Sequence, residues 1–267
     1  TLPPDGTMRT YNNPVLIPDG ERVHLIYHKN YERAFLITSL DDGKTWSEAR
    51  EITESYRRFP YEWNVCATGP GHGIRTGTGR LVASVWLALG EMSRDGMTRA
   101  HAPSVAGAIY SDDHGETWQA GALAQGLANG NETTVAETED GKLLFNYRNT
   151  DECRRRALGL SCDGGESLES RWFCEELVDP RCFGSMVSTA EGILFANCED
   201  AERRIRLTVK RSRDNGSSWE KVWEVDSVGG YPDIAEADGK VYLFYERQEG
   251  DEIGELVLAA GVWDREA

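Results

Sequence analysis

The sequence predicts an all-β fold in which four-stranded antiparallel sheets are arranged radially, a β-propeller with five or six blades. Three observations lead to this prediction. A short motif, Ser-x-Asp-x-Gly-x-Thr/Ser-Trp, occurs four times, beginning at positions 39, 111, 161 and 212. Short apolar or alternating runs of strand length lie between the copies, and no long helical period interrupts them. Repeats about 50 residues apart accommodate four strands with their turns, and radial stacking protects most sheet edges.

Each copy of the motif predicts a tight turn between two strands. Asp and Ser side chains bond to nearby backbone amides, Gly takes a positive φ without steric cost, and the aromatic residue anchors the turn on its sheet. The third copy has Leu in place of Trp. The copies are Ser39-Leu-Asp-Asp-Gly-Lys-Thr-Trp46, Ser111-Asp-Asp-His-Gly-Glu-Thr-Trp118, Ser161-Cys-Asp-Gly-Gly-Glu-Ser-Leu168 and Ser212-Arg-Asp-Asn-Gly-Ser-Ser-Trp219.

The predicted strands group into five units within a single domain that spans residues 1–267. The units are about 8–50, 62–122, 128–172, 182–224 and 228–264, and a sixth blade is expected if the two ends of the chain combine. A polar insertion near 91–102 enlarges the second unit and is interpreted as a loop over the ligand face. A β-sandwich is the alternative fold, which the regular repeat disfavours. The strand runs are 23–27, 35–38, 81–87, 105–110, 142–147, 157–160, 193–196, 206–210, 241–245 and 256–262.

The charge of the chain argues against several classes of partner. It has 29 Lys and Arg against 45 Asp and Glu, a formal net charge of -16, which opposes wide contact with nucleic acid or anionic lipid. An anionic ligand therefore requires a local cluster of arginines. No apolar run approaches the roughly 20 residues of a membrane span, and no secretory signal is recognised. The compartment stays open, with a secreted or periplasmic location preferred to a cytoplasmic one.

The six cysteines give no metal-binding pattern, since they lie at irregular spacings without a Cys-x-x-Cys pair. We expect them to be small buried hydrophobic residues. A disulfide among the last four is the alternative. The cysteines are Cys66, Cys153, Cys162, Cys174, Cys182 and Cys198.

Several further segments carry a resemblance to a known family. In chain order they are Gly69-Pro-Gly-His-Gly-Ile-Arg75, Gly79-Arg-Leu-Val82, Asn131-Glu-Thr133, Leu143-Leu-Phe-Asn-Tyr-Arg148, Cys182-Phe-Gly-Ser185, Arg204-Ile-Arg-Leu-Thr-Val209, Gly230-Tyr-Pro-Asp-Ile234 and Leu243-Phe-Tyr-Glu246. Over nearly its whole length the chain resembles the bacterial exo-α-sialidases, with the four motifs as their Asp boxes. The resemblance implies a six-bladed propeller that removes terminal sialic acid with retention, without a metal or another cofactor.

By motif, the resemblance makes Tyr231 the catalytic nucleophile and Glu132 the base that accepts its phenolic proton. A neutral phenol approaches an anionic substrate more easily than a carboxylate does, but it needs a base at neutral pH. From the residues alone, a strand-end aromatic and a loop cap are the structural alternatives for these two positions.

The resemblance also implies a set of residues that bind the substrate. Arg148 and Arg204 match two members of an arginine triad that holds the sialic acid carboxylate, for which the planar guanidinium is suited. Both are also compatible with solvated positions at a strand end. Glu246 matches the acid that braces the first arginine of the triad. Arg75, with His72, lies in a Gly-rich turn expected at the ligand face.

The first blade departs from the family pattern. Asn12 stands at the position that matches the first arginine of the triad, and Arg9 lies three residues earlier. The acid that protonates the leaving group is expected between this segment and the first Asp box, where Glu32 is the candidate outside the turns.

Three functions are therefore compatible with the sequence. The first is a retaining exo-glycosidase acting on sialic acid or a related ulosonic acid. The second is a propeller enzyme acting on another acidic glycan, one that contains uronic acid. The third is a non-catalytic propeller that binds glycans. The expected partners are sialylated or other acidic glycans, and the fold alone does not decide among the three functions.

Overall fold

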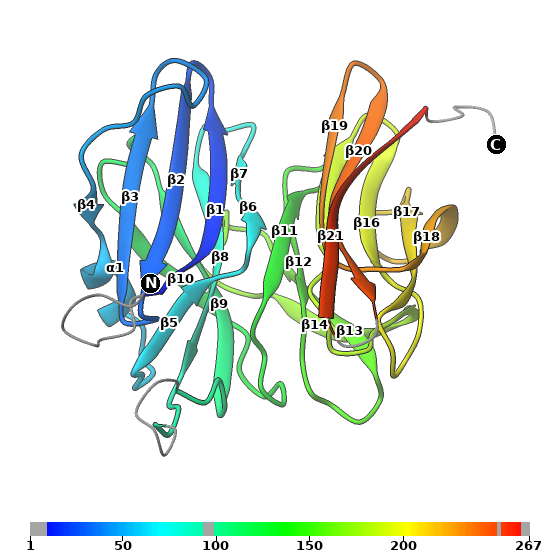
Figure 1. Cartoon of the computed structure of the whole chain (residues 1–267). Coiled ribbons are helices and arrows are strands. Elements are labelled where there is room, and N and C mark those ends of the chain that lie inside the picture. The colour runs from blue at the N-terminus through cyan, green and yellow to red at the C-terminus, as the bar shows by residue number, and fades with distance from the viewer. Residues whose placement is uncertain (1–9, 93–98, 250–251, 263–267) are drawn as a thin grey trace.

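Five antiparallel sheets follow one another along the chain in the computed structural model, which describes residues 10–92, 99–249 and 252–262 (Figure 1). The first sheet contains β1 (Tyr11–Asp19), β2 (Arg22–Lys29), β3 (Arg33–Ser39) and β4 (Arg50–Glu51), with β6 (Gly71–His72) added beside β1. The second contains β5 (Val65–Thr68), β8 (Leu81–Ala88), β9 (Ser104–Ser111) and β10 (Gln119–Leu123), with β7 (Ile74–Arg75) paired to β8. One short helix, α1 (Thr53–Arg57), lies between the two sheets in sequence.

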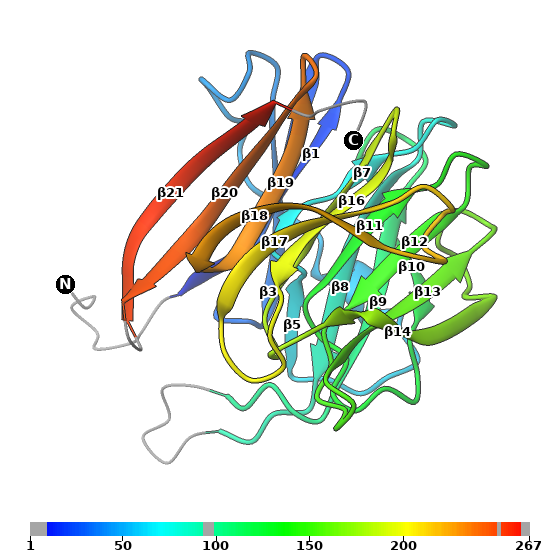
Figure 2. The ribbon, with the colours of Figure 1, turned by 90° about the vertical axis from the view of Figure 1, so that its right-hand side faces the viewer.

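The third and fourth sheets are regular blades of four strands. They are β11 (Thr133–Glu137), β12 (Leu143–Tyr147), β13 (Arg155–Ser161) and β14 (Ser170–Val178), then β15 (Ser185–Thr189), β16 (Gly192–Cys198), β17 (Ile205–Ser212) and β18 (Glu220–Val228). The last sheet has three strands, β19 (Gly230–Ala237), β20 (Lys240–Glu249) and β21 (Glu252–Val262). Figure 2, turned by 90°, shows β21, β20 and β19 side by side in this last sheet. The all-β propeller predicted from the sequence is thus confirmed.

The blade count differs from the six blades that the resemblance implies, because the described residues form five sheets. The five sheets correspond closely to the five units read from the sequence. The chain ends were expected to combine into a sixth blade, but the free edge of β1 is taken by β6, which pairs with it in parallel through Val15 and Leu16. A strand from the other end of the chain therefore has no edge to join there.

The Asp boxes form the turns predicted for them, each between the third and fourth strands of its blade. In the first box the hydroxyl of Ser39 donates to Asp41 at 2.9 Å and accepts from the amide of Gly43 at 2.8 Å. The same pair of bonds recurs in the other three boxes. Gly216 shows why glycine stands at the fifth position: its φ is +92°, and a Cβ there would lie 2.5 Å from Leu144.

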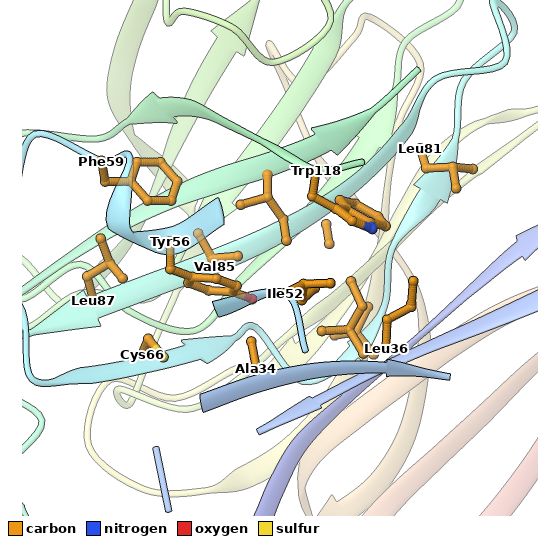
Figure 3. Packing of buried hydrophobic residues seen from close by; sticks show 14 of the residues in the cluster. Ala34, Leu36, Ile52, Tyr56, Phe59, Cys66, Leu81, Val85, Leu87 and Trp118 are labelled. Atoms are coloured by element: carbon orange, nitrogen blue, oxygen red, sulfur yellow. The ribbon is translucent and has the colours of Figure 1, made fainter. Parts of the chain in front are cut away.

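Successive blades are held together by apolar cores between their faces. Figure 3 shows the first of these cores, in which Leu36 of blade one lies near Leu81 and Val85 of blade two. Corresponding clusters join blade two to three, three to four, and four to five. Because successive side chains of a strand point to opposite faces of its sheet, each blade contributes apolar side chains to the core on either side of it. The tightly buried rows fix the order of the blades around the propeller axis.

The last and first sheets meet in a different way. Between them lies a groove with a volume of about 530 Å³, whose lining includes Leu16, Pro18, Phe244 and Leu258. The direct link across this junction is polar, since Nδ1 of His72 on β6 lies 2.7 Å from Oδ1 of Asp233 on β19. The junction of blades five and one is therefore open and partly apolar.

Two other expectations from the sequence have mixed outcomes. Cys66, Cys174, Cys182 and Cys198 are buried as expected, but Cys153 and Cys162 are exposed because they lie in a loop and in the third Asp box. All six are free thiols, so the structure contains no disulfide. Within the described residues, no helix is long and apolar enough to cross a membrane.

Candidate active site

Glu132 and Arg148 are brought together by the first hairpin of blade three. Glu132 directly precedes β11 and Arg148 directly follows β12, and the two strands pair with Thr133 opposite Tyr147. The amide of Arg148 donates to the carbonyl of Glu132 at 3.0 Å, which continues this ladder by one step. Both side chains are therefore fixed at the same end of the hairpin.

Tyr231 reaches these two residues from blade five. It is the second residue of β19, the first strand of its sheet, and the first strands of neighbouring sheets contact one another around the axis. Its backbone has a positive φ of 46°, a left-handed conformation that is uncommon for a residue with a side chain. Such strained positions are found most often at functional sites.

The three side chains share one hydrogen-bond network. The hydroxyl of Tyr231 donates toward both carboxylate oxygens of Glu132, at 2.8 and 3.0 Å. Nη1 of Arg148 donates to the hydroxyl of Tyr231 at 2.8 Å and also to Oε2 of Glu132. Nε of Arg148 is buried and has no partner among the described residues. Arg148 therefore keeps a donor free for a bound anion.

Burial and charge together keep the phenol of Tyr231 protonated. Burial raises its pKa well above the ordinary value of 10.0, and the negative charge of Glu132 raises it further, while Arg148 opposes both effects. The pKa of Arg148 is also raised, since the charges of Glu132 and Tyr231 outweigh burial, which would lower it. The site thus presents a neutral phenol between a carboxylate and a permanent cation.

Arg204 and Glu246 lie on the other side of Tyr231. The guanidinium carbon of Arg204 is 5.1 Å from the centroid of the Tyr231 ring, a cation–π contact. Glu246 on β20 is paired with Gly230, the residue before Tyr231. Burial raises the pKa of the Glu246 carboxyl above its ordinary value, although the positive charge of Arg204 partly offsets this. Five of the six candidate residues therefore lie together: Glu132, Arg148, Arg204 and Glu246 surround the phenol of Tyr231.

Arg75 lies elsewhere in the structure. Its Nε donates to Asp19 at 2.8 Å, at the outer end of β1, and its side chain is 43% exposed. It lines the groove between the last and first sheets. The structure shows no contact between Arg75 and the Tyr231 network within the described residues.

The first-blade candidates also lie outside this network. The side-chain amide of Asn12 donates to Asn13 at 3.2 Å, and Glu32 forms an ion pair with Arg99 at 2.9 Å. Arg9 is not among the described residues.

Two groups of residues near the site were not singled out from the sequence. The rings of Tyr31, Trp86 and His101 pack together, with centroids 4.8 to 5.9 Å apart. The charge of Glu132 acts on the pKa of both Tyr31 and His101, so this cluster lies beside the site. His101 belongs to the polar insertion near 91–102, and this insertion was the sequence feature that could have pointed to the cluster. Residues 93–98 of the insertion lie outside the described residues. The second group is Phe183, whose ring is 6.0 Å from that of Tyr231, with Cys182 next to it; the sequence marked their segment only as part of the resemblance and gave neither residue a role at the site.

Among the described residues, no group of three or more His, Cys, Asp or Glu side chains is placed to hold a metal ion. The groups that the structure brings together are a phenol, a carboxylate and two guanidinium groups, which are suited to nucleophilic attack, proton transfer and recognition of an anion.

Comparison with known proteins places this chain in a family. The BNR repeat-like domain matches residues 4–243 of the chain. The chain belongs to the BNR repeat-like domain family. Among curated relatives of this BNR propeller, the sialidase of Micromonospora viridifaciens is 30% identical over 246 residues, covering 86% of the chain and 36% of the relative. Human Sialidase-3 is 31% identical over 211 residues, covering 74% of the chain and 47% of the relative.

Solved structures agree with this BNR fold. The Hadza microbial sialidase Hz136 superposes with a TM-score of 0.78 at 24% identity, covering 97% of the chain and 53% of that protein. The Trypanosoma rangeli sialidase superposes with a TM-score of 0.70 at 20% identity, covering 94% of the chain and 44% of that protein. The resemblance to sialidases drawn from the motifs is thus confirmed. The BNR chain spans about a third to a half of the length of these relatives.

Proposed function

We propose that this protein is a retaining exo-glycosidase of sialidase type, which hydrolyses terminal sialic acid or a related ulosonic acid from sialylated glycans. One observation carries the proposal: Tyr231, Glu132 and Arg148, which come from two separate blades, share a single hydrogen-bond network. An ordinary strand-end tyrosine does not require a partly buried carboxylate and a partly buried arginine at its hydroxyl. Similarity to sialidases supports the same activity.

In the proposed first step, the oxygen of Tyr231 attacks the anomeric carbon while Glu132 accepts the phenolic proton. The bond from the anomeric carbon to the leaving oxygen breaks, and that oxygen departs with its electron pair and takes up a proton. In the second step water attacks the anomeric carbon and gives a proton to the acid that protonated the leaving oxygen, while the bond from the anomeric carbon to Tyr231 breaks and the phenolic oxygen takes back the proton held by Glu132. Two displacements at one carbon retain its configuration.

The raised pKa of Tyr231 suits this mechanism. A phenol that stays neutral at pH 7 does not repel the negative carboxylate of an incoming ulosonic acid, as an Asp or Glu nucleophile would. The proton is removed only as the bond forms, when Glu132 is already within 3.0 Å.

Arg148 and Arg204 are the proposed carboxylate-binding residues. Arg148 has a buried Nε without a partner, and Arg204 lies over the face of the Tyr231 ring. A carboxylate held by both would lie beside the nucleophile, with charge-assisted bonds that offset the net negative charge of the chain. Glu246 would orient Arg204, the cation whose charge acts on its pKa.

We also propose that the functional propeller has six blades, with one more four-stranded sheet between β19–β21 and β1–β4. Four junctions between successive blades are closed apolar cores, whereas this junction is the apolar groove described above. A blade at this place would border β1 and the site. It would be positioned to supply the leaving-group acid and the first arginine, for which Asn12 and Glu32 show no suitable contacts.

The experiment that tests the function is turnover of a fluorogenic sialoside by the purified protein and by Tyr231→Phe and Glu132→Ala. Loss of turnover in both variants, with unchanged unfolding curves, supports the proposal. Turnover that persists in Tyr231→Phe would contradict a tyrosine nucleophile. Turnover confined to uronate-containing glycans would favour the second hypothesis, and glycan binding without turnover of either class would favour the third.

A further inference from the structure

Two buried thiols lie directly behind the proposed nucleophile. Cys182 stands shortly before β15 and Cys198 is the last residue of β16, and these strands pair with Ser185 opposite Ala196. Both cysteines are therefore at the same end of one strand pair. Each is fully buried, and neither takes part in the proposed reaction.

The two thiols contact the backbone that carries Tyr231. The thiol hydrogen of Cys198 is shared between the carbonyl of Gly229, whose oxygen lies 3.0 Å from Sγ, and the sulfur of Cys182. The sulfur of Cys182 accepts a hydrogen bond from the backbone amide of Tyr231. A Cβ on Gly230 would lie 3.3 Å from the same sulfur. The backbone of residues 229–231 therefore contacts both sulfurs.

We infer that Cys182 and Cys198 form a reversible disulfide whose formation displaces Tyr231 and switches off the site. The inference rests on the proposed function, because it assigns a regulatory modification to the same active site. It stands on the placement of two thiols at one end of a strand pair, each against the segment 229–231, behind a residue with a left-handed backbone.

Oxidation by a peroxide gives a balanced reaction. The thiolate of Cys182 attacks one oxygen of hydrogen peroxide, the O–O bond breaks, and the hydroxide released takes up the thiol proton to give water and a sulfenic acid. The sulfur of Cys198 then attacks Sγ of Cys182, which forms the S–S bond and expels hydroxide. That hydroxide takes the proton of Cys198 and becomes a second water. The two thiols lose two electrons, and the peroxide gains them.

Cys182 is the better attacking thiol of the pair. Its hydrogen bond from Cys198 lowers its pKa, and the positive charge of Arg204 lowers it further against the effect of burial. The pKa of Cys198 is raised by the same hydrogen bond and by burial. Cys198 therefore acts second, as the resolving thiol.

The disulfide would change the support of Tyr231 in two ways. The carbonyl of Gly229 loses its donor, since a disulfide has no S–H group. The two sulfurs also move from hydrogen-bonding contact to about 2.05 Å, which draws Cys182 away from the amide of Tyr231. Tyr231 has a left-handed φ of 46°, and loss of these contacts would let the segment relax and draw its hydroxyl away from Glu132.

The experiment treats the reduced full chain with hydrogen peroxide, blocks the remaining thiols and digests the protein with trypsin. Cleavage after Arg181 and Arg203 places both cysteines in one peptide, residues 182–203. We expect this peptide to become lighter by two hydrogen atoms, whereas oxidation of Met186 would add an oxygen. We also expect faster backbone hydrogen exchange at 229–231 and a fall in sialoside turnover of roughly 10- to 100-fold, all reversed by dithiothreitol.

Two variants separate this pair from the other cysteines. Cys198→Ser keeps a hydroxyl donor for Gly229 but cannot form the disulfide, so peroxide should change neither its hydrogen exchange nor its turnover. The matched control is the double variant Cys153→Ser with Cys162→Ser, which removes two exposed thiols and should keep the full response to peroxide.

Three results would overturn the inference: a 182–203 peptide that keeps its reduced mass, a disulfide that leaves exchange and turnover unchanged, or an undiminished response of Cys198→Ser. If the reduced protein does not turn over sialosides, the proposed function fails. The peptide mass and the hydrogen exchange at 229–231 then decide the inference by themselves.

Discussion

Tyr231 donates its phenolic hydrogen between the two carboxylate oxygens of Glu132, at 2.8 and 3.0 Å, although 99 positions separate the two residues in the chain. The fold brings them together because each lies at the start of the first strand of its blade, next to the axis. Arg148 donates to both residues and so ties the network together.

Arg148→Lys is expected to lower kcat/KM for a sialoside by about 10- to 100-fold. Lysine keeps the positive charge but loses the planar fork, so it cannot bind Glu132, Tyr231 and a substrate carboxylate together. Each charge-assisted bond lost is worth about 1.5–3 kcal/mol. Steady-state kinetics of the purified variant measure the change.

The matched control for Arg148→Lys is Arg33→Lys. Arg33 forms an exposed ion pair with Glu51 on the outer strands of blade one, away from the site. Its kinetics should equal those of the wild-type protein. Equal kinetics for Arg148→Lys as well would remove Arg148 from the proposed binding site.

The contact of His72 with Asp233 is expected to make stability depend on pH. Burial alone would lower the pKa of His72, but the hydrogen bond and charge of Asp233 outweigh it and raise the pKa above 6.5. The contribution of His72 to the free energy of unfolding is therefore complete below pH 6.5 and is lost as the pH rises through the higher folded-state pKa. The raised pKa agrees with the geometry, because Nε2 of His72 also lies 3.1 Å from the carbonyl of Met186, and both ring nitrogens donate only in the protonated form.

Asp233 sets the lower limit of the same pH window. Burial would raise its pKa, but the hydrogen bond and charge of His72, with the hydroxyl of Ser185, lower it below 3.8. Its contribution is thus present above pH 3.8 and is lost as the pH falls through the lower folded-state pKa. Urea unfolding at about pH 6 and pH 8.5 should show a loss of stability in the wild type that is smaller in His72→Asn, which donates to Asp233 without titrating. An equal loss in both proteins would show that other groups cause the pH dependence.

The tryptophans of the Asp boxes are expected to contribute unequally to the free energy of unfolding. Trp118 is 3% exposed and packs in the core between blades one and two, whereas Trp46 is 36% exposed. Trp118→Ala should lower the free energy of unfolding by about 3–5 kcal/mol because it leaves a cavity. Trp46→Ala should cost less than about 1 kcal/mol. Urea unfolding of the two variants measures the difference, and equal losses would contradict the assigned packing.

The strands that the sequence predicted best are those with a buried row of apolar side chains. All ten predicted runs lie in strands of the structure, apart from Lys142, which directly precedes β12. Outer strands such as β14 and β18 were missed because polar residues interrupt their apolar ones and most of their residues are exposed or half-buried. The Asp boxes located the turns beside them, since the Ser, Asp and Gly of each box form a local set of bonds that does not depend on the rest of the fold.

Site residues that lie in short local motifs could be predicted from the sequence. Contacts that depend on how distant segments are arranged in the fold could not. Tyr231, Glu132 and Arg148 were identified from short segments, and the structure brings them into contact. The pairing of β1 with β6 and the ion pair of Arg75 with Asp19 join residues that are 56 or more positions apart in the sequence. No local sequence pattern predicts such contacts. The cluster of Tyr31, Trp86 and His101 combines three segments in the same way.

The open face of the last blade is expected to cause self-association of this chain. Phe244 and Leu258 are cross-strand neighbours on β20 and β21, they are 48% and 66% exposed, and they line the groove beside blade one. Burying such apolar area is favourable by about 25 cal/mol per Å², so two copies should associate through it when no sixth blade covers it.

Phe244→Ser with Leu258→Ser should therefore lower the sedimentation coefficient at high protein concentration and reduce binding of a hydrophobic dye, without lowering the stability of the fold. Leu40→Ser is the control, because Leu40 is 73% exposed but lies in the first Asp box, away from the groove. It should associate as the wild type does. A wild-type chain that stays monomeric and binds no dye would mean that the face is not available to a partner, and the proposal of a sixth blade at this junction would lose its support.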